Sequence, residues 1–149
     1  MMEDWETAGT LDDLVEQLQS RIDEEEARIF TRRTLDEARH PSNMGPLEEP
    51  TATVRKTGTC GDTMEFFIRV EGDRLTEVTF LTDGCGATVA CGSMLTKMAK
   101  GMTLEEVMAL RDSELLDVLG GLPDENLHCA RLAVDTLHGA VHAAESEAR

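Results

Sequence analysis

The first thirty residues carry an apolar stripe at helical spacing. Its members recur mainly three, four or seven residues apart: Leu11, Leu14, Val15, Leu18, Ile22 and Ile29. Thr10 is followed three residues later by Asp13, a pair that resembles a capping box. The pattern predicts a helix from about Leu11 to Phe30. A second helix is predicted from Thr31 to Arg39, ending before Pro41 because the residue before a proline disfavours helical geometry.

The middle of the chain changes to the alternating pattern of strands. Three segments have it, and they run from Thr51 to Thr57, from Met64 to Val70 and from Leu75 to Leu81. The polar run 71–74, Glu-Gly-Asp-Arg, is typical of a hairpin turn. We therefore expect a small antiparallel sheet with one face to be covered.

The pattern beyond the strands is helical again. One apolar stripe, closed by Gly101, predicts a helix after residue 86: Ala87, Cys91, Met94, Leu95 and Met98. Two short helices are predicted over 103–110 and over 112–119, and a long one over about 127–144. Strands followed by helices favour an α+β fold with a three-stranded antiparallel sheet packed by helices and an extra N-terminal helix. We divide the chain into an N-terminal helical extension, 1–33, and a main domain, 34–149.

Composition and charge narrow the class of protein. The 149 residues suffice for one domain with a sizeable core. The formal net charge of −16 argues against nucleic acid or an anionic membrane as a partner. No apolar run reaches the ~20 residues of a membrane span, and no signal peptide is evident. We expect a cytoplasmic protein, in which the four cysteines serve metal or sulfur chemistry rather than disulfides.

Candidate metal ligands lie in three separate segments. Cys60 and Asp62 share a glycine-containing turn, Cys85 stands between two glycines, and His128 precedes Cys129. Each cysteine could instead be a small buried side chain, and each turn merely a turn. Cys85 and Cys129 lie at predicted helix N-termini, where the helix dipole is expected to lower a thiol pKa.

Other cysteine and histidine residues are expected to lie outside this group. Cys91 falls on an apolar stripe and is predicted to be buried in the core. His138 and His142 have no thiol or acidic neighbour in sequence, so we interpret both as surface residues.

The ordered motifs resemble those of the U-type iron–sulfur cluster scaffolds, the IscU family and the N-terminal domain of NifU. The matching segments are 34–45, which ends in Asn-Met-Gly, Cys60-Gly-Asp62, residues 82–86 around Gly-Cys-Gly, Lys100–Glu106, Leu122-Pro123 and His128-Cys129. The resemblance spans about residues 34 to 144. It agrees with the fold class predicted from the patterns.

The resemblance implies a function and a ligand set. A cluster, usually [2Fe–2S] and in some cases [4Fe–4S], would be assembled from iron and from sulfur supplied by a cysteine desulfurase, then passed to recipient apoproteins. The implied ligands are Cys60, Cys85 and Cys129, with Asp62 or His128 as the fourth. Cys129 is the implied acceptor of persulfide sulfur. The protein would then be an assembly scaffold rather than an enzyme, and the same side chains can hold Zn²⁺.

Departures from the family pattern qualify the implied partners. Residues 124–126 read Asp-Glu-Asn where the family has Pro-Val-Lys, which argues against docking of an Hsp70-type chaperone. Cys91 replaces a small residue such as serine, Asp83 replaces a tyrosine, and His40 replaces an asparagine. The N-terminal helix lies outside the resemblance. Its stripe either docks on the domain or forms a homodimer contact or another partner surface.

Alternatives from other classes use the same residues. A zinc-binding module or a sulfur-acceptor protein would need the same cysteine, aspartate and histidine side chains without cluster chemistry. A thiol enzyme would use Cys129 activated by His128. We consider the enzyme the weaker hypothesis, because adjacent side chains seldom point at each other.

Overall fold

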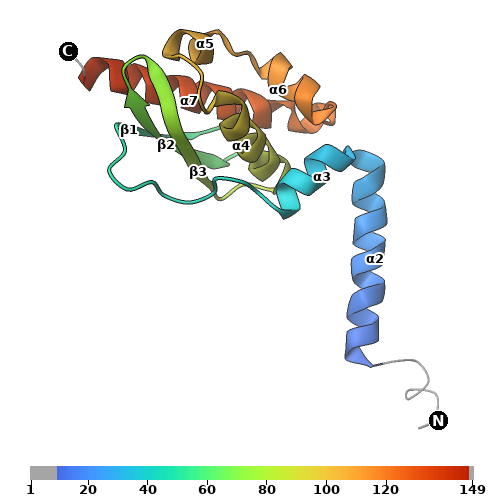
Figure 1. Ribbon diagram of the computed structural model, residues 1–149. Coiled ribbons are helices and arrows are strands. Elements are labelled where there is room, and N and C mark those ends of the chain that lie inside the picture. The colour runs from blue at the N-terminus through green and yellow to red at the C-terminus, as the bar shows by residue number, and fades with distance from the viewer. Residues whose placement is uncertain (1–9, 148–149) are drawn as a thin grey trace, which may run out of the picture.

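The predicted α+β fold is confirmed by a computed structural model, which describes residues 10–147 (Figure 1). Its helices are α2 (Leu11–Ile29), α3 (Arg32–Arg39), α4 (Gly86–Ala99), α5 (Leu104–Ala109), α6 (Asp112–Leu119), the 3₁₀ turn η1 (Asp124–Asn126) and α7 (Leu127–Glu147). Its strands are β1 (Ala52–Thr57), β2 (Thr63–Glu71) and β3 (Arg74–Thr82). Among residues 10–147, no helix is long and apolar enough to cross a membrane.

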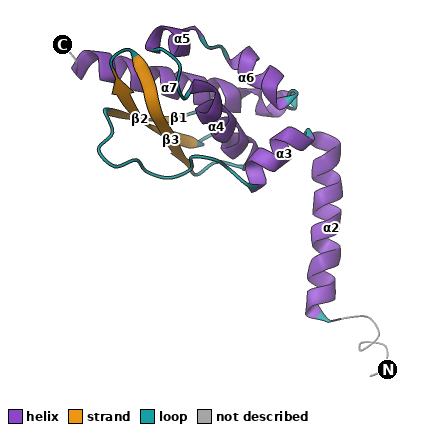
Figure 2. Ribbon diagram, viewed as in Figure 1, coloured by secondary structure: helices purple, strands orange, loops and turns teal. Residues whose placement is uncertain are grey.

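The three strands, orange in Figure 2, form one antiparallel sheet. Hydrogen bonding sets their order as β1-β2-β3. The predicted hairpin is present, with Glu71 paired to Arg74. Alternation along β2 places Met64, Phe66 and Ile68 on the buried face. The helices α4 and α7 cover that face. The other face is mainly polar but also carries the half-buried Phe67 and Leu81.

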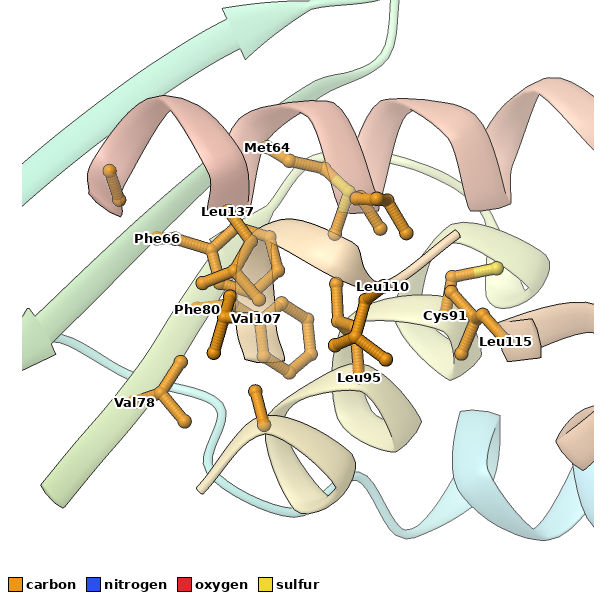
Figure 3. Close-up of a cluster of buried hydrophobic side chains, with 14 of the residues drawn as sticks. Met64, Phe66, Val78, Phe80, Cys91, Leu95, Val107, Leu110, Leu115 and Leu137 are labelled. Atoms are coloured by element: carbon orange, nitrogen blue, oxygen red, sulfur yellow. The ribbon is translucent and has the colours of Figure 1, made fainter. Parts of the chain in front are cut away.

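The core lies between the sheet and these two helices (Figure 3). Phe66 and Phe80 meet at its centre, with ring centroids 6.1 Å apart. Cys91 is fully buried among apolar side chains, as predicted. Burial raises the pKa of the Cys91 thiol far above its usual range, so this sulfur stays a neutral thiol.

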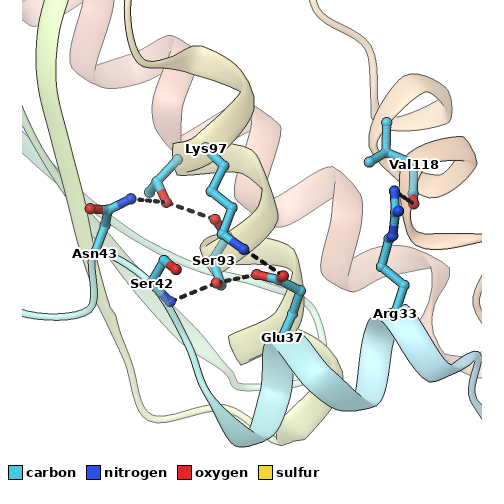
Figure 4. A network of polar contacts seen from close by, with 8 residues as sticks. Arg33, Glu37, Ser42, Asn43, Ser93, Lys97 and Val118 are labelled. Atoms are coloured by element: carbon cyan, nitrogen blue, oxygen red, sulfur yellow. Dashed lines mark hydrogen bonds and ion pairs between the residues drawn. The ribbon is translucent and has the colours of Figure 1, made fainter.

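A polar network attaches α3 and the following loop to α4 (Figure 4). Glu37 accepts hydrogen bonds from Ser93 Oγ and Lys97 Nζ, both at 2.6 Å. The backbone N–H of Ser42 also donates to Ser93 Oγ, at 2.8 Å, and Asn43 Nδ2 donates to Thr96 Oγ1, at 3.1 Å. Because α4 begins beside Cys85, this network fixes the helix on which one candidate ligand depends.

The N-terminal helix is not docked on the domain by its apolar stripe. α2 projects away from the body and joins it only near α3 (Figure 1). None of its residues is buried. Arg39 of α3 holds it through exposed ion pairs to Asp23, at 3.1 Å, and to Glu26, at 3.0 Å. The prediction that the apolar stripe of α2 docks on the domain is therefore wrong for this structure, and the alternative of a homodimer contact or partner surface stays open.

His138 differs from its predicted surface position. It is half-buried, and its Nε2 lies 2.8 Å from the carbonyl oxygen of Val107. The prediction failed because α5, which is distant from His138 in the sequence, packs against this part of α7 in the fold. His142 is exposed, as predicted.

Candidate metal centre

Three chain segments converge at one end of the sheet. The β1–β2 turn carries Cys60 and Asp62, the β3–α4 loop carries Cys85, and the first turn of α7 carries His128 and Cys129. Antiparallel pairing of β2 with both neighbours places the first turn beside the second loop. α7 packs across the sheet and brings its N-terminus to the same place.

The β1–β2 turn has a compact geometry that suits ligand presentation. Gly58 N donates to the carbonyl oxygen of Asp62, at 2.8 Å, and Gly61 N donates to that of Gly58, at 3.0 Å. Gly61 has a φ of 92°, a conformation that strongly favours glycine. The turn therefore leaves Cys60 exposed and Asp62 half-buried, with both side chains at the converging end.

The β3–α4 loop is tied to this turn by Asp83. Its carboxylate accepts a hydrogen bond of 2.8 Å from the backbone N–H of Thr63. Cys85, at the end of the loop, is the N-cap residue of α4. The residue that replaces the family's tyrosine thus has a structural contact of its own, which connects the two ligand-bearing segments.

The ligand atoms form two overlapping triads. In each triad the candidate atoms all lie within 4.8 Å of one another: Cys60, Asp62 and His128 in the first, and Asp62, Cys85 and Cys129 in the second. Asp62 belongs to both. All five side chains singled out from the sequence therefore come together around one carboxylate, a mixed sulfur, oxygen and nitrogen donor set.

Sequence reasoning missed Thr88, which lies inside the second triad. Its hydroxyl donates to Asp62 Oδ2 at 2.9 Å and lies 3.3 Å from the Sγ of Cys129 and 3.7 Å from that of Cys85. The side chain is fully buried. The signal in the sequence was its place three residues after Cys85, in the first turn of the predicted helix.

The prediction of a lowered pKa for Cys129 is wrong. Burial raises the pKa of this thiol, and a hydrogen bond from Thr88 opposes that rise. The nearby Cys85, Cys60 and Asp62 raise it further, because their negative charges disfavour a thiolate. Desolvation thus outweighs the dipole of α7 at this position.

His128 and Cys129 approach each other, contrary to the expectation for adjacent residues. His128 Nε2 lies 3.7 Å from Cys129 Sγ. This proximity alone does not make an activated nucleophile, because the raised pKa of Cys129 favours the thiol form. The geometry is equally that of two neighbouring ligands.

A groove of about 500 Å³ borders the site on the side of α2 and α3. Phe30, Leu35 and Ala38 contribute apolar walls to the groove, and Cys85 is among the residues that line it.

The thiols of the site differ in exposure. Cys60 and Cys85 are accessible from solvent, whereas Cys129 is buried.

Comparison with known proteins agrees with this fold. The family model described as the NifU-like N terminal domain matches residues 17–148. The chain therefore belongs to the NifU-like N-terminal domain family. The match begins within α2 and so takes in more of the N-terminal region than the sequence motifs did.

Named relatives fall in the same group. The chain is 36% identical over 115 residues to the iron–sulfur cluster assembly scaffold protein IscU 1 of Archaeoglobus fulgidus, covering 76% of this chain and 74% of the relative. It is 39% identical over 116 residues to IscU of Aquifex aeolicus, covering 75% and 73%. The nitrogen fixation protein NifU of Nostoc sp. is 33% identical, and the match covers 76% of this chain but 41% of that protein.

Solved structures share the fold. A NifU-like N-terminal protein from Brucella abortus superimposes with a TM-score of 0.63 at 20% identity, covering 78% of this chain and 94% of that one. A putative scaffold protein for the SUF system from Fervidobacterium islandicum gives 0.62 at 21% identity, covering 76% and 97%. At these identities the likeness concerns the fold alone.

Proposed function

We propose that this protein is a scaffold on which an iron–sulfur cluster, [2Fe–2S] in the first instance, is assembled and then passed to recipient apoproteins. The observation that carries the proposal is the convergence of three cysteines, Asp62 and His128 from three segments. Relatives named as cluster assembly scaffolds support it. The cluster is the cargo of the protein rather than a resident cofactor.

The chemistry of the donor set fits this role. Thiolates are the usual ligands of iron–sulfur clusters. Three are present, and the fourth position falls to Asp62 or His128. A carboxylate is a harder and weaker donor to such iron than a thiolate, so a site with Asp62 should release its cargo more readily than a four-cysteine site. Two exposed thiols place the cargo where an acceptor protein can reach it.

Sulfur delivery is proposed to end at Cys129. A desulfurase persulfide would transfer its outer sulfur to the Cys129 sulfur, leaving a persulfide here and a thiol on the desulfurase. Cys129 is 1% exposed, so the transfer requires the side chains around it to move. Mass analysis of the Cys129 peptide after incubation with desulfurase and cysteine would detect the added sulfur atom.

Anaerobic reconstitution tests the scaffold role. The protein is incubated with ferrous iron, cysteine, a cysteine desulfurase and a dithiol reductant that supplies the electrons needed to turn persulfide sulfur into sulfide. Its visible spectrum, iron and acid-labile sulfide are then measured. We expect iron and sulfide in a stoichiometric cluster. Cys60→Ser, Cys85→Ser and Cys129→Ser should each abolish stable assembly, because serine oxygen is a poor substitute for a thiolate.

Cys91→Ser is the matched control, because Cys91 is fully buried in the core and belongs to neither ligand triad. It should assemble a cluster normally. Loss of the cluster in this variant alone would show that the ligand assignment is wrong. A wild-type protein that takes up zinc but never iron with sulfide would instead identify a zinc-binding module.

A further inference from the structure

The apolar stripe of α2 is the largest feature that the cluster site does not use. Its six side chains are between 48% and 75% exposed: Leu11, Leu14, Val15, Leu18, Ile22 and Ile29. The polar side of α2, through Asp23 and Glu26, faces α3, so the body of the protein leaves the stripe uncovered. A helix with one apolar side normally buries it against a partner.

The spacing of the stripe identifies a helix as the partner. Val15, Ile22 and Ile29 repeat every seven residues. Leu11 and Leu18 are also seven residues apart, and Leu18 lies three residues after Val15. These are the a and d positions of a heptad, with β-branched residues at a and leucine at d. That combination favours a parallel, two-stranded coiled coil.

Charges beside the seam identify the partner as a second copy of this chain in parallel. Arg21 falls at position g and Glu26 at position e of the next heptad, and these two positions meet across a parallel pair. An antiparallel pair with the same apolar layers facing would instead place Arg21 near its own counterpart and Glu26 near Asp12, so that like charges would meet. Self-complementarity in one orientation is what a homodimer requires.

One residue of the seam opposes pairing. Glu25 occupies a d position, where two copies would face each other. Arg21 and Arg28 lie four residues before and three residues after it on the same helix, close enough to offset part of its charge. The seam is therefore weakest at this layer, which makes Glu25 a sensitive probe of the arrangement.

We propose that α2 pairs with α2 of a second copy to form a parallel coiled-coil dimer that carries two cluster sites. α2 projects from the body (Figure 1), so pairing leaves both bodies free. Covering both stripes removes on the order of 1,000 Å² from water, near the lower limit for specific interfaces, so the dimer should be reversible. The proposal does not depend on which metal or cluster the site holds.

Sedimentation equilibrium of the full-length chain tests the proposal. We expect a monomer–dimer equilibrium, with Leu18→Glu monomeric at all concentrations. Glu25→Leu should tighten the dimer by at least about tenfold, since it replaces facing charges by apolar contact. Glu24→Leu is the control, because it makes the same replacement one residue away from the seam.

A charge exchange tests the orientation. Arg21→Glu should weaken the dimer about threefold to tenfold, and Arg21→Glu with Glu26→Arg should restore it. Circular dichroism establishes that each variant is folded. The proposal is overturned by a full-length chain that stays monomeric at about 200 μM, by a dimer that survives Leu18→Glu, by equal effects of Glu25→Leu and Glu24→Leu, or by failure of the charge exchange to restore pairing.

Discussion

At the scale of single residues, Thr88 and Asp62 are the connected pair at the centre of the site. One hydroxyl has a single proton, so Thr88 cannot donate to Asp62 and Cys129 at the same time. Its oxygen lies near three candidate ligands: Asp62 in the β1–β2 turn, Cys85 at the start of α4, and Cys129 in the first turn of α7. We infer that this hydroxyl keeps the sulfur and oxygen donors close together before any metal arrives.

Thr88→Val should therefore weaken metal binding without disturbing the core. Valine fills nearly the same volume as threonine, but the hydrogen bonds from the hydroxyl to the ligands are lost. Removing a side chain that orients metal ligands typically costs tenfold to a hundredfold in affinity, and we expect about tenfold for Zn²⁺. Competition titration with a chromophoric chelator measures it.

Thr88→Ser is the control for this prediction. It retains the hydroxyl and should recover most of the zinc affinity, although it loses a buried methyl group. Equal or tighter zinc binding by Thr88→Val would show that the hydroxyl competes with the metal instead of arranging its ligands.

At the scale of elements, the Glu37 network connects α3 to α4. Burial raises the cost of ionising Glu37, but hydrogen bonds from Lys97 and Ser93 and the positive charges of Lys97 and Arg33 outweigh it and lower its pKa below 4.5. A lowered folded-state pKa means that this carboxylate stabilises the fold above the unfolded pKa. The contribution disappears as the pH falls through the folded pKa.

Glu37→Gln should lower the free energy of unfolding by about 1–2 kcal/mol near neutral pH, through loss of the charged hydrogen bonds. The difference from wild type should stay constant down to about pH 5 and shrink below pH 4.5, where the carboxyl of the unfolded chain begins to take up a proton while folded Glu37 stays ionised. Urea unfolding of both proteins across this range measures it. A difference that is the same at pH 4 and pH 7 would contradict the assigned role of the charge.

At the scale of the whole molecule, α2 makes few stabilising contacts with the rest of the protein. No residue of α2 is buried, and exposed ion pairs such as those of Arg39 contribute little to stability. The division of the chain into 1–33 and 34–149 stays a prediction. The structure adds that Thr31 caps α3 and donates to the carbonyl oxygen of Leu119, so α3 belongs with the body.

A chain that begins at Thr31 should fold and still assemble a cluster, because all proposed ligands lie beyond it. Loss of the partly buried Phe30 should cost about 1 kcal/mol. Thermal unfolding and anaerobic reconstitution, compared with the full-length chain, check this. A truncated protein that is folded but takes up no iron and sulfide would contradict it.

Much of the architecture follows from local patterns. Strand alternation, the 71–74 turn and the helical stripes predicted the α-helices and strands to within three residues at their ends, whereas the 3₁₀ turn η1 was not predicted. The sequence also singled out Cys60, Asp62, Cys85, His128 and Cys129 as one group. The predictions of helices and strands succeeded because turn chemistry and apolar periodicity are properties of short segments. The structure brings the five side chains together, and their role as ligands stays a prediction.

Contacts between distant segments were decided only by the tertiary structure. Thr88 reaches Cys129 across 41 residues, and Ser93 reaches Glu37 across 56. The pKa of Cys129 depends on burial by the rest of the chain, which overrides the local helix dipole. The exposure of the α2 stripe likewise depends on where α3 turns the chain. Burial and long-range hydrogen bonding are set by packing, and a linear pattern does not record packing.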